Sequence, residues 1–286
     1  MEPTHTLARR LWAAIEPIHC IVYFTAGPVE AVRKVGLRGF WMGYFAGRFA
    51  PLGPVPAEAV VAMAYGFAPG MVKRAIPDAW AFADPEAVVA VRIASAGEAL
   101  RGQLDQPAVA ALTELSGLLW AAVETCRFEG RPLAAAWSQV PRPADAVESA
   151  WLAATILREH RGDGHVLAGV AAGLRGLDAT VSFVATGAIS RELIQPSRGW
   201  SDEDWEQSVR RLQARGFLDR DGRLTKAGGT LRRDLEDLTD RLASAPVERL
   251  GETGVSRAIA LATPISRHLI DTGVIPDPTP VGAPRP

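Results

Sequence analysis

Apolar residues recur every three or four positions through most of the chain, and this period constrains the fold more than any other feature. The first predicted helix, residues 6–15, places Leu7, Leu11, Trp12 and Ile15 on one face. Pro17 is expected to interrupt it, because proline lacks the amide hydrogen that a helix needs. Similar segments, separated by turns rich in glycine and proline, continue toward the C-terminus. The sequence therefore predicts a fold that is mostly α-helical.

Charge and cysteine content exclude several classes of protein. The formal net charge is −1 at pH 7, which argues against a strongly basic nucleic-acid binder, although a local basic patch can still exist. Cys20 and Cys126 lie far apart, so the sequence predicts neither a disulfide framework nor a zinc knuckle. Residues 1–5 do not resemble a signal peptide, and no uninterrupted apolar run is long enough to cross a membrane. We therefore expect a cytoplasmic protein with no membrane partner.

Sequence echoes between the two halves of the chain indicate an internal duplication. Residues 11–16 read LWAAIE and residues 119–124 read LWAAVE, and the pair Trp41 and Arg48 recurs at the same spacing as Trp151 and Arg158. The alternative is chance similarity between helices rich in alanine and leucine. The duplication predicts two related helical units in tandem, arranged as a pseudo-dimer. The predicted domains are residues 1–107, residues 108–250, and a C-terminal helix with a proline-rich tail at 251–286.

The end of the second unit follows the order of a winged helix. A predicted helix at 201–215 is followed by the hairpin-turn signal Asp221-Gly222 and by a long helix from Thr230 to Leu242. The string Leu212-x-x-Arg215-Gly216-Phe217-Leu218, followed by Leu224-Thr225-x-Ala227-Gly228, resembles the MarR-type regulators. The resemblance implies a winged helix at about 177–245 with a short β-hairpin wing, a degenerate copy of it in the first unit, and DNA binding.

A second resemblance extends over most of the chain. It rests on the motifs EPIH at 16–19, LRGFW at 37–41, APLGP at 50–54 and HRGDGH at 160–165. These motifs resemble an uncharacterised bacterial helix-turn-helix family, and this resemblance implies no particular activity.

The predicted recognition helix is acidic where DNA would lie. Its first half carries Asp202, Glu203, Asp204 and Glu206, which repel phosphates, and residues 201–250 hold ten basic and eleven acidic side chains. Two interpretations stay open: the winged helix serves only as scaffold, or it contacts DNA through basic side chains near this helix and the wing. The candidate DNA-binding residues are Arg191, Arg198, Arg210, Arg220 and Arg223.

A dense polar stretch, residues 158–165, lies between two apolar helical segments. We expect it to break the helix, and a structural interpretation makes Asp163 the N-cap of a new helix from His165. Three interpretations stay open: a metal site that His19 can complete, an acid–base catalytic site, or a structural network at the helix ends. No cofactor or metal identity is indicated. The candidate catalytic residues are Glu159, His160, Asp163 and His165.

The duplication also predicts where a ligand binds. The first copy is apolar where the second holds the polar stretch, so a pseudo-dimer of this kind has one functional pocket between its halves. The candidate ligand-binding residues are His19, Tyr23, Tyr44, Arg48, Arg158, His160 and His165.

The leading functional hypothesis is a DNA-binding transcriptional regulator that responds to a small molecule bound between the two units. The alternative is an enzyme that keeps the winged helix as scaffold and works through the polar stretch. Duplex DNA and a small molecule are the expected partners, the oligomeric state stays open, and the tail at 275–286 is expected to be extended and mobile.

Overall fold

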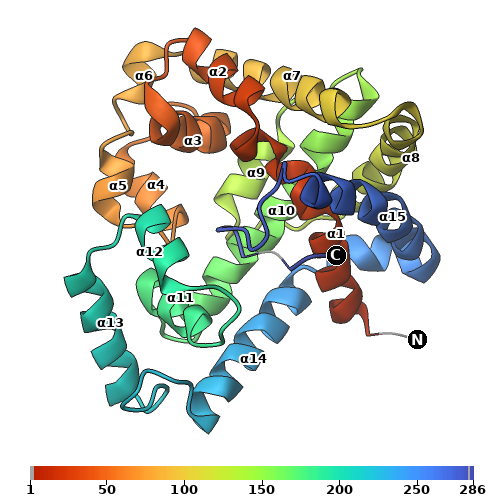
Figure 1. Ribbon diagram of the computed structural model, residues 1–286. Helices are drawn as coiled ribbons and strands as arrows, with labels where there is room; N and C mark the ends of the chain where they lie inside the picture. The colour runs from red at the N-terminus through yellow and green to blue at the C-terminus, as the bar shows by residue number, and fades with distance from the viewer. Residues whose placement is uncertain (1–2, 283) are drawn as a thin grey trace.

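The computed structural model describes residues 3–282 and 284–286. This part of the chain folds into α-helices and one short 3-10 turn, as the helical period predicted (Figure 1). Met1 and Glu2, at the N-terminus, and Ala283, in the predicted tail, lie outside the described residues. The first half comprises α1 (Thr4–Phe24), α2 (Ala26–Lys34), α3 (Gly39–Phe49), η1 (Ala50–Leu52), α4 (Ala57–Met63), α5 (Pro69–Lys73), α6 (Ala79–Phe82) and α7 (Pro85–Gln103).

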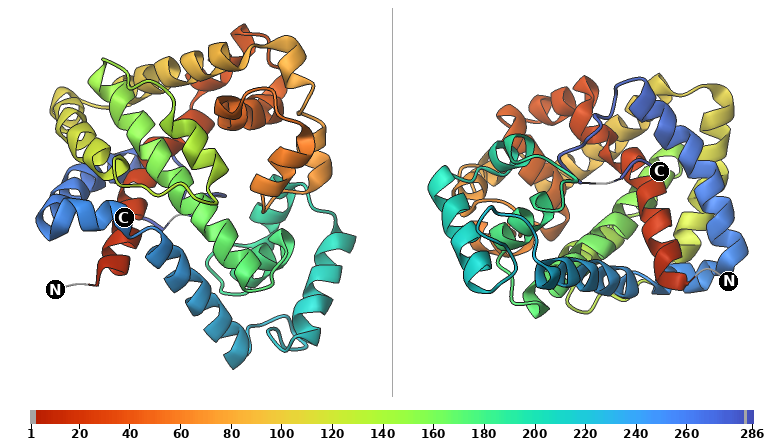
Figure 2. Two further views of the ribbon diagram at one scale, coloured as in Figure 1. Left: turned by 180° about the vertical axis from the view of Figure 1, so that it is seen from behind. Right: turned by 60° about the horizontal axis from the view of Figure 1, so that its bottom comes forward.

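The second half is built around one long helix, α10, that crosses the molecule (Figures 1 and 2). It packs against α1 and α7 of the first half, against the two helices that precede it in the second half, and against the helix that ends at Leu242. Four helices that follow it form a separate group at the edge (Figure 1). The elements are α8 (Gln106–Val123), α9 (Pro132–Ser138), α10 (Ala146–Ala171), α11 (Gly176–Val184), α12 (Arg191–Arg198), α13 (Asp202–Ala214), α14 (Lys226–Leu242) and α15 (Ala245–Asp271).

Helix α1 runs through Pro17 without a break, so the predicted interruption is wrong. Proline inside a helix removes one backbone hydrogen bond. Here α1 packs against α7, α10, α14 and α15, and this buries Ile15, Ile18 and Ile21 almost completely. Each buried isoleucine contributes about 1.5–3 kcal/mol, which together outweighs the cost of roughly 3 kcal/mol for the proline.

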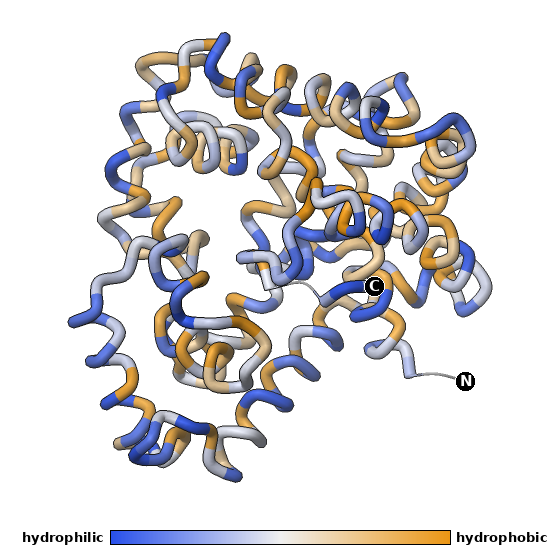
Figure 3. The backbone as a smooth tube through the Cα atoms, in the orientation of Figure 1, coloured by the Kyte–Doolittle hydropathy of each residue, from blue (hydrophilic) through white to orange (hydrophobic). Residues whose placement is uncertain are grey.

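Two apolar cores divide the described residues. The larger takes side chains from α1 to α9, from the first half of α10 and from α15. The smaller takes side chains from the end of α10 and from α11 to α14. In Figure 3 hydrophobic colour is densest around α1, α8, α10 and α15, whereas hydrophilic and hydrophobic residues alternate along α13 and α14. These cores group the helices differently from the predicted boundary at 107/108, and the internal duplication stays a prediction.

The predicted β-hairpin wing does not form as a pair of strands. Between α13 and α14 the described residues contain only an isolated antiparallel bridge, Leu218 to Leu224. One oxygen of the Asp219 carboxylate accepts hydrogen bonds from the backbone amides of Asp221 and Arg223, each at 2.9 Å. The Asp219 side chain thus binds backbone amides that a longer β-ladder would use. The segment therefore forms a tight loop and no paired strands. We call residues 216–225 the wing loop.

No single described helix is long and apolar enough to span a membrane. Helices α10 and α11 meet the length and composition test only as a pair, and they are bent by 97° at the break between them.

The described residues of the C-terminal tail contact the body of the protein, and the expected mobility of the tail stays a prediction. Arg198 donates a hydrogen bond to the Pro280 carbonyl at 2.8 Å, and Arg267 donates one to the Pro286 carbonyl at 2.8 Å. Thr279 is buried. These backbone contacts hold a proline-rich segment that composition alone assigns to solvent.

The close approach of α11 to the loop after α4 generates a stability prediction. A Cβ atom added at Gly176 would overlap the Tyr65 carbonyl oxygen, which belongs to the rigid backbone. We expect Gly176→Ala to lower the free energy of unfolding by about 1–3 kcal/mol, as overpacking does. The measurement is urea denaturation. Gly102→Ala, where an added Cβ meets nothing within 4 Å, is the control and should be neutral or slightly stabilising. Equal stability of the two variants would contradict the observed packing.

Candidate functional site

The polar stretch lies inside α10, which continues from Ala146 to Ala171 without a break. The expected break at Gly162-Asp163-Gly164 is therefore wrong, and Asp163 is not the cap of a new helix. Glycine lowers helix stability by about 1 kcal/mol relative to alanine, but Gly164 permits a close approach. A Cβ added there would lie 3.0 Å from Arg131 Nη1 and 3.4 Å from Leu242 Cβ. Gly164 therefore lets α10 pack closely against Arg131 and Leu242.

Asp163 caps a different helix. Its Oδ2 accepts hydrogen bonds from the backbone amides of Leu133 at 3.1 Å and Ala134 at 3.0 Å, in the first turn of α9. Burial is the main cause that raises the pKa of Asp163 to about 6, while these two amides act in the opposite direction. The side chain therefore anchors α9 on α10.

His160 and His165 point into separate environments. His160 Nε2 lies 3.1 Å from the Arg127 carbonyl, and because a carbonyl only accepts, Nε2 carries the hydrogen. His165 Nδ1 lies 3.0 Å from Thr239 Oγ1, whose own hydrogen is donated to the Leu235 carbonyl, so Nδ1 also donates. Burial lowers the pKa of both histidines to about 4, and both rings are neutral at pH 7.

The four candidate catalytic residues thus serve separate contacts and do not face one reacting atom. Among the described residues, no group of three His, Cys, Asp or Glu side chains is arranged to hold a metal ion. The arrangement matches the third interpretation of the stretch, a structural network, although the network lies within a continuous helix.

Glu159 is the centre of a buried ion-pair cluster. Its side chain is 1% exposed and receives a two-pronged hydrogen bond from Arg48 on α3, Nε to Oε1 at 2.8 Å and Nη2 to Oε2 at 2.9 Å. Arg158 donates to Glu159 Oε2 at 2.9 Å and to Glu16 Oε1 at 3.2 Å. Burial alone would raise the pKa of Glu159, but the two guanidiniums outweigh it and hold this pKa well below its usual range.

His19 connects the ion-pair cluster to aromatic side chains. Its Nδ1 lies 2.9 Å from Thr155 Oγ1, which already donates its hydrogen to the Trp151 carbonyl. His19 Nδ1 therefore donates, and Nε2 accepts from the Tyr23 hydroxyl at 3.3 Å. Burial first, then the charge of Arg158, lowers the pKa of His19 well below its usual value.

Five of the seven predicted ligand-binding residues meet here. The ring centroids of Tyr23 and Tyr44 lie 5.0 Å apart, and Tyr44 interacts electrostatically with Arg48 and Arg158. We call His19, Tyr23, Tyr44, Arg48 and Arg158 the inner cluster. His160 and His165 are not part of it.

Sequence reasoning missed two residues at the inner cluster. Arg92 on α7 stacks over Tyr23 at 5.0 Å to the ring centroid. The sequence pattern indicates that Arg92 is buried, because Arg92 lies in line with the apolar residues Val88, Ala96 and Leu100, each four positions from the next. Glu16 gave no comparable signal.

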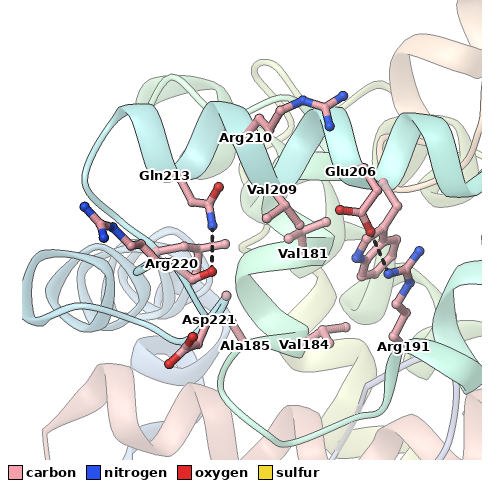
Figure 4. A pocket seen from close by; sticks show the side chains of 13 residues that line it. Val181, Val184, Ala185, Arg191, Glu206, Val209, Arg210, Gln213, Arg220 and Asp221 are labelled. Atoms are coloured by element: carbon pink, nitrogen blue, oxygen red, sulfur yellow. Dashed lines mark hydrogen bonds and ion pairs between the residues drawn. The ribbon is translucent and has the colours of Figure 1, made fainter.

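The predicted DNA-binding residues divide into two groups. Arg198 turns inward: it binds the Pro280 carbonyl and lies 4.3 Å from the Phe67 ring centroid. Arg191 is held by Asp202 and Glu206, each at 2.9 Å, and its pairing with Glu206 is drawn in Figure 4. Both arginines are therefore engaged within the protein.

Arg210, Arg220 and Arg223 are exposed. Arg210 and Arg220 line a surface pocket of about 370 Å³ between α11, α13 and the wing loop (Figure 4). Arg223 lies 3.4 Å from Asp221, and both side chains are open to solvent, so this pair is worth little. These three arginines remain accessible to a phosphate backbone.

His160 generates a prediction on pH. With a folded pKa of about 4 against a model value of 6.5, the unfolded chain binds a proton in this window that the folded state does not. The stabilisation by neutral His160 is full above pH 6.5 and is lost as pH falls toward 4. At about 1.4 kcal/mol per pKa unit, the difference of about 2.5 units amounts to roughly 3–4 kcal/mol.

We expect His160→Gln to make the loss of unfolding free energy between pH 6.5 and pH 4 shallower than in the wild type, as measured by urea denaturation across this range. His268→Gln is the matched control, since His268 Nε2 also contacts a backbone carbonyl, that of Gln103, but is exposed. The same pH slope in both variants would contradict the assignment.

Comparison with known proteins supports one classification. The chain matches the model of a helix-turn-helix family over residues 8–276. No curated protein and no solved structure matches it. The family model spans nearly the whole chain, so the smaller core, the inner cluster and almost all of the larger core lie within the matched region. The chain belongs to this helix-turn-helix family.

Proposed function

We propose that this protein binds duplex DNA through α12, α13 and the wing loop. The observation that carries the proposal is the α12–turn–α13 unit in a chain of a helix-turn-helix family. Gly199 takes the left-handed conformation that ends α12, with φ of 73°. Ser201 then caps α13 in a capping box with Asp204. A short turn of this kind, containing glycine, is typical of the motif.

A third helix supports the pair. α11 packs against α13, and the smaller core brings together Leu177 and Val181 of α11, Ile194 of α12, and Trp205 and Leu212 of α13. Three helices around one core are the common form of DNA-binding helix-turn-helix units. The unit forms the edge of the molecule, with α13 far from α8 and α15 (Figures 1 and 2).

The charges of α13 decide which part of it meets DNA. Asp202, Glu203 and Glu206 are exposed in its first half, and Arg191 neutralises part of this charge through its two ion pairs. The exposed Arg210 lies in the second half. We therefore propose that phosphates are contacted by the C-terminal half of α13 and by the wing loop, and not by the N-terminal half that usually enters the groove.

The proposal includes regulation by a small molecule at the inner cluster. Arg198, the last residue of α12, interacts electrostatically with Tyr44, Arg48 and Arg158. A ligand among these side chains would change the forces on the end of α12. Because α12 and α13 are joined by a short turn, the position of α13 would change with it.

The salt dependence of DNA binding tests the first part of the proposal. We expect wild-type protein to bind a random duplex at low salt, with log K falling linearly with log of the salt concentration. Arg220→Ala/Arg223→Ala should make this slope shallower by about 1.8, the effect of two lost phosphate contacts. Fluorescence anisotropy of a labelled duplex measures both slopes.

The matched control removes two exposed positive charges elsewhere. Lys34→Ala/Arg249→Ala alters α2 and α15, whose side chains at these positions are exposed, and it should retain the wild-type slope. Absence of binding by the wild type at low salt, or the same slope change in both double variants, would refute DNA contact by the wing loop.

A further inference from the structure

Arg92 is a buried cation without a carboxylate partner. Its side chain belongs to a residue that is 3% exposed, and its Nε and Nη2 have no hydrogen-bond partner among the described residues. Its other contacts are the faces of Tyr23 at 5.0 Å and Trp151 at 5.8 Å. Arg161 and Arg232 also have unpaired nitrogens, but each forms an ion pair with Glu236. Arg92 has no such partner in the described part of the chain.

The surroundings of Arg92 carry excess positive charge. Arg48, Arg158 and Arg198 interact with one another around Tyr44, and Arg92 contributes to the electrostatics of Tyr23 and His19. Two carboxylates face these four guanidiniums. Glu159 forms ion pairs with Arg48 and Arg158. Glu16 forms an ion pair with Arg158 and accepts a hydrogen bond from the Trp12 indole. Buried charge that lacks a counter-charge is unfavourable, so two positive charges are left for an external partner.

The backbone has made room for Arg92. A Cβ added at Gly47 would lie 2.8 Å from Arg92 Nη1, so glycine at this position of α3 gives the guanidinium room that a larger residue would reduce. The protein therefore accommodates a buried cation and supplies no carboxylate for it. Nε and Nη2 of Arg92 therefore remain able to donate hydrogen bonds to a group from outside the protein.

The hydroxyl groups nearby are not equivalent. The Tyr23 hydroxyl donates its hydrogen to His19, because His19 Nδ1 is already a donor to Thr155. Arg198 interacts electrostatically with Tyr44, and a guanidinium can only donate. Arg92 lies over the Tyr23 ring and Arg198 interacts with Tyr44, so a guanidinium donor stands beside each ring of the Tyr23–Tyr44 pair, and this combination suits an anion.

We propose that Arg92, Arg198 and Tyr44 form a binding site for a small anion that carries a carboxylate or phosphate group. Guanidinium matches either group with paired hydrogen bonds. The Pro280 carbonyl now accepts from Arg198 Nη2, and an anion at this guanidinium competes with the tail for that donor. The effect of the anion on α13 rests on the proposed function, whereas anion binding itself does not.

The test measures anion binding without DNA. The full-length protein is titrated with inorganic phosphate, and separately with acetate, at constant ionic strength, and its thermal unfolding is followed. We expect one of the two anions to raise the wild-type Tm in a saturable manner, and the arm that saturates identifies the head group. Arg92→Met should bind that anion at least tenfold more weakly.

Arg232→Met is the control, because it also removes a buried arginine with unpaired nitrogens, but in the smaller core. It should retain wild-type affinity for the anion. If Arg92→Met does not fold, Arg92→Lys keeps the charge, loses the planar fork, and should bind measurably more weakly than the wild type. Without any anion, Arg92→Met should be no less stable than Arg232→Met, which loses an ion pair.

Two results would overturn the proposal: no saturable change in Tm with either anion up to tens of millimolar, or the same anion response in the wild type and both Arg92 variants. A saturable response that requires Arg92 supports the site even if the protein shows no affinity for DNA. Failure of the anion site and failure of DNA binding are therefore separate results.

Discussion

The paired hydrogen bonds between Arg48 and Glu159 hold the structure together at its centre. Glu159 lies midway along α10 and is 1% exposed, so its charge is tolerable only because Arg48 and Arg158 surround it. Arg158 continues the chain of contacts to Glu16 on α1. Three helices from distant parts of the sequence, α1, α3 and α10, are thereby fixed in one relative arrangement.

The polar side chains of α10 act as connectors between helices. Asp163 anchors α9, Arg161 pairs with Asp240 of α14 at 2.8 Å, and His165 contacts Thr239 on the same helix. α10 therefore links the larger core, which contains the inner cluster, to the group α11–α14. This continuity gives the proposed regulation a physical route, because Arg158 of the inner cluster lies on α10, whose end packs in the smaller core, and Arg198 of α12 interacts with Tyr44, Arg48 and Arg158.

The sequence predicted the helical architecture, and it grouped His19, Tyr23, Tyr44, Arg48 and Arg158, which the structure brings together from α1, α3 and α10. The internal duplication behind that grouping stays a prediction. It failed at Asp163, because a carboxylate beside glycine looks like a local cap, and only tertiary structure reveals that it caps another helix. The contact of Arg198 with the tail was not predicted for a similar reason, because a charged residue at a helix end usually faces solvent. The wing failed because the competing contacts of the Asp219 side chain are invisible to β-propensity.

The central claim of this account is that the inner cluster and the α12–α13 unit respond together. Amide hydrogen exchange of the full-length protein, with and without a saturating concentration of the anion that it binds, tests this claim most directly. We expect altered exchange at α12 and at residues 279–282 in the wild type, and no alteration in an Arg198→Met variant. Unchanged exchange at α12 while the anion is bound would contradict the coupling.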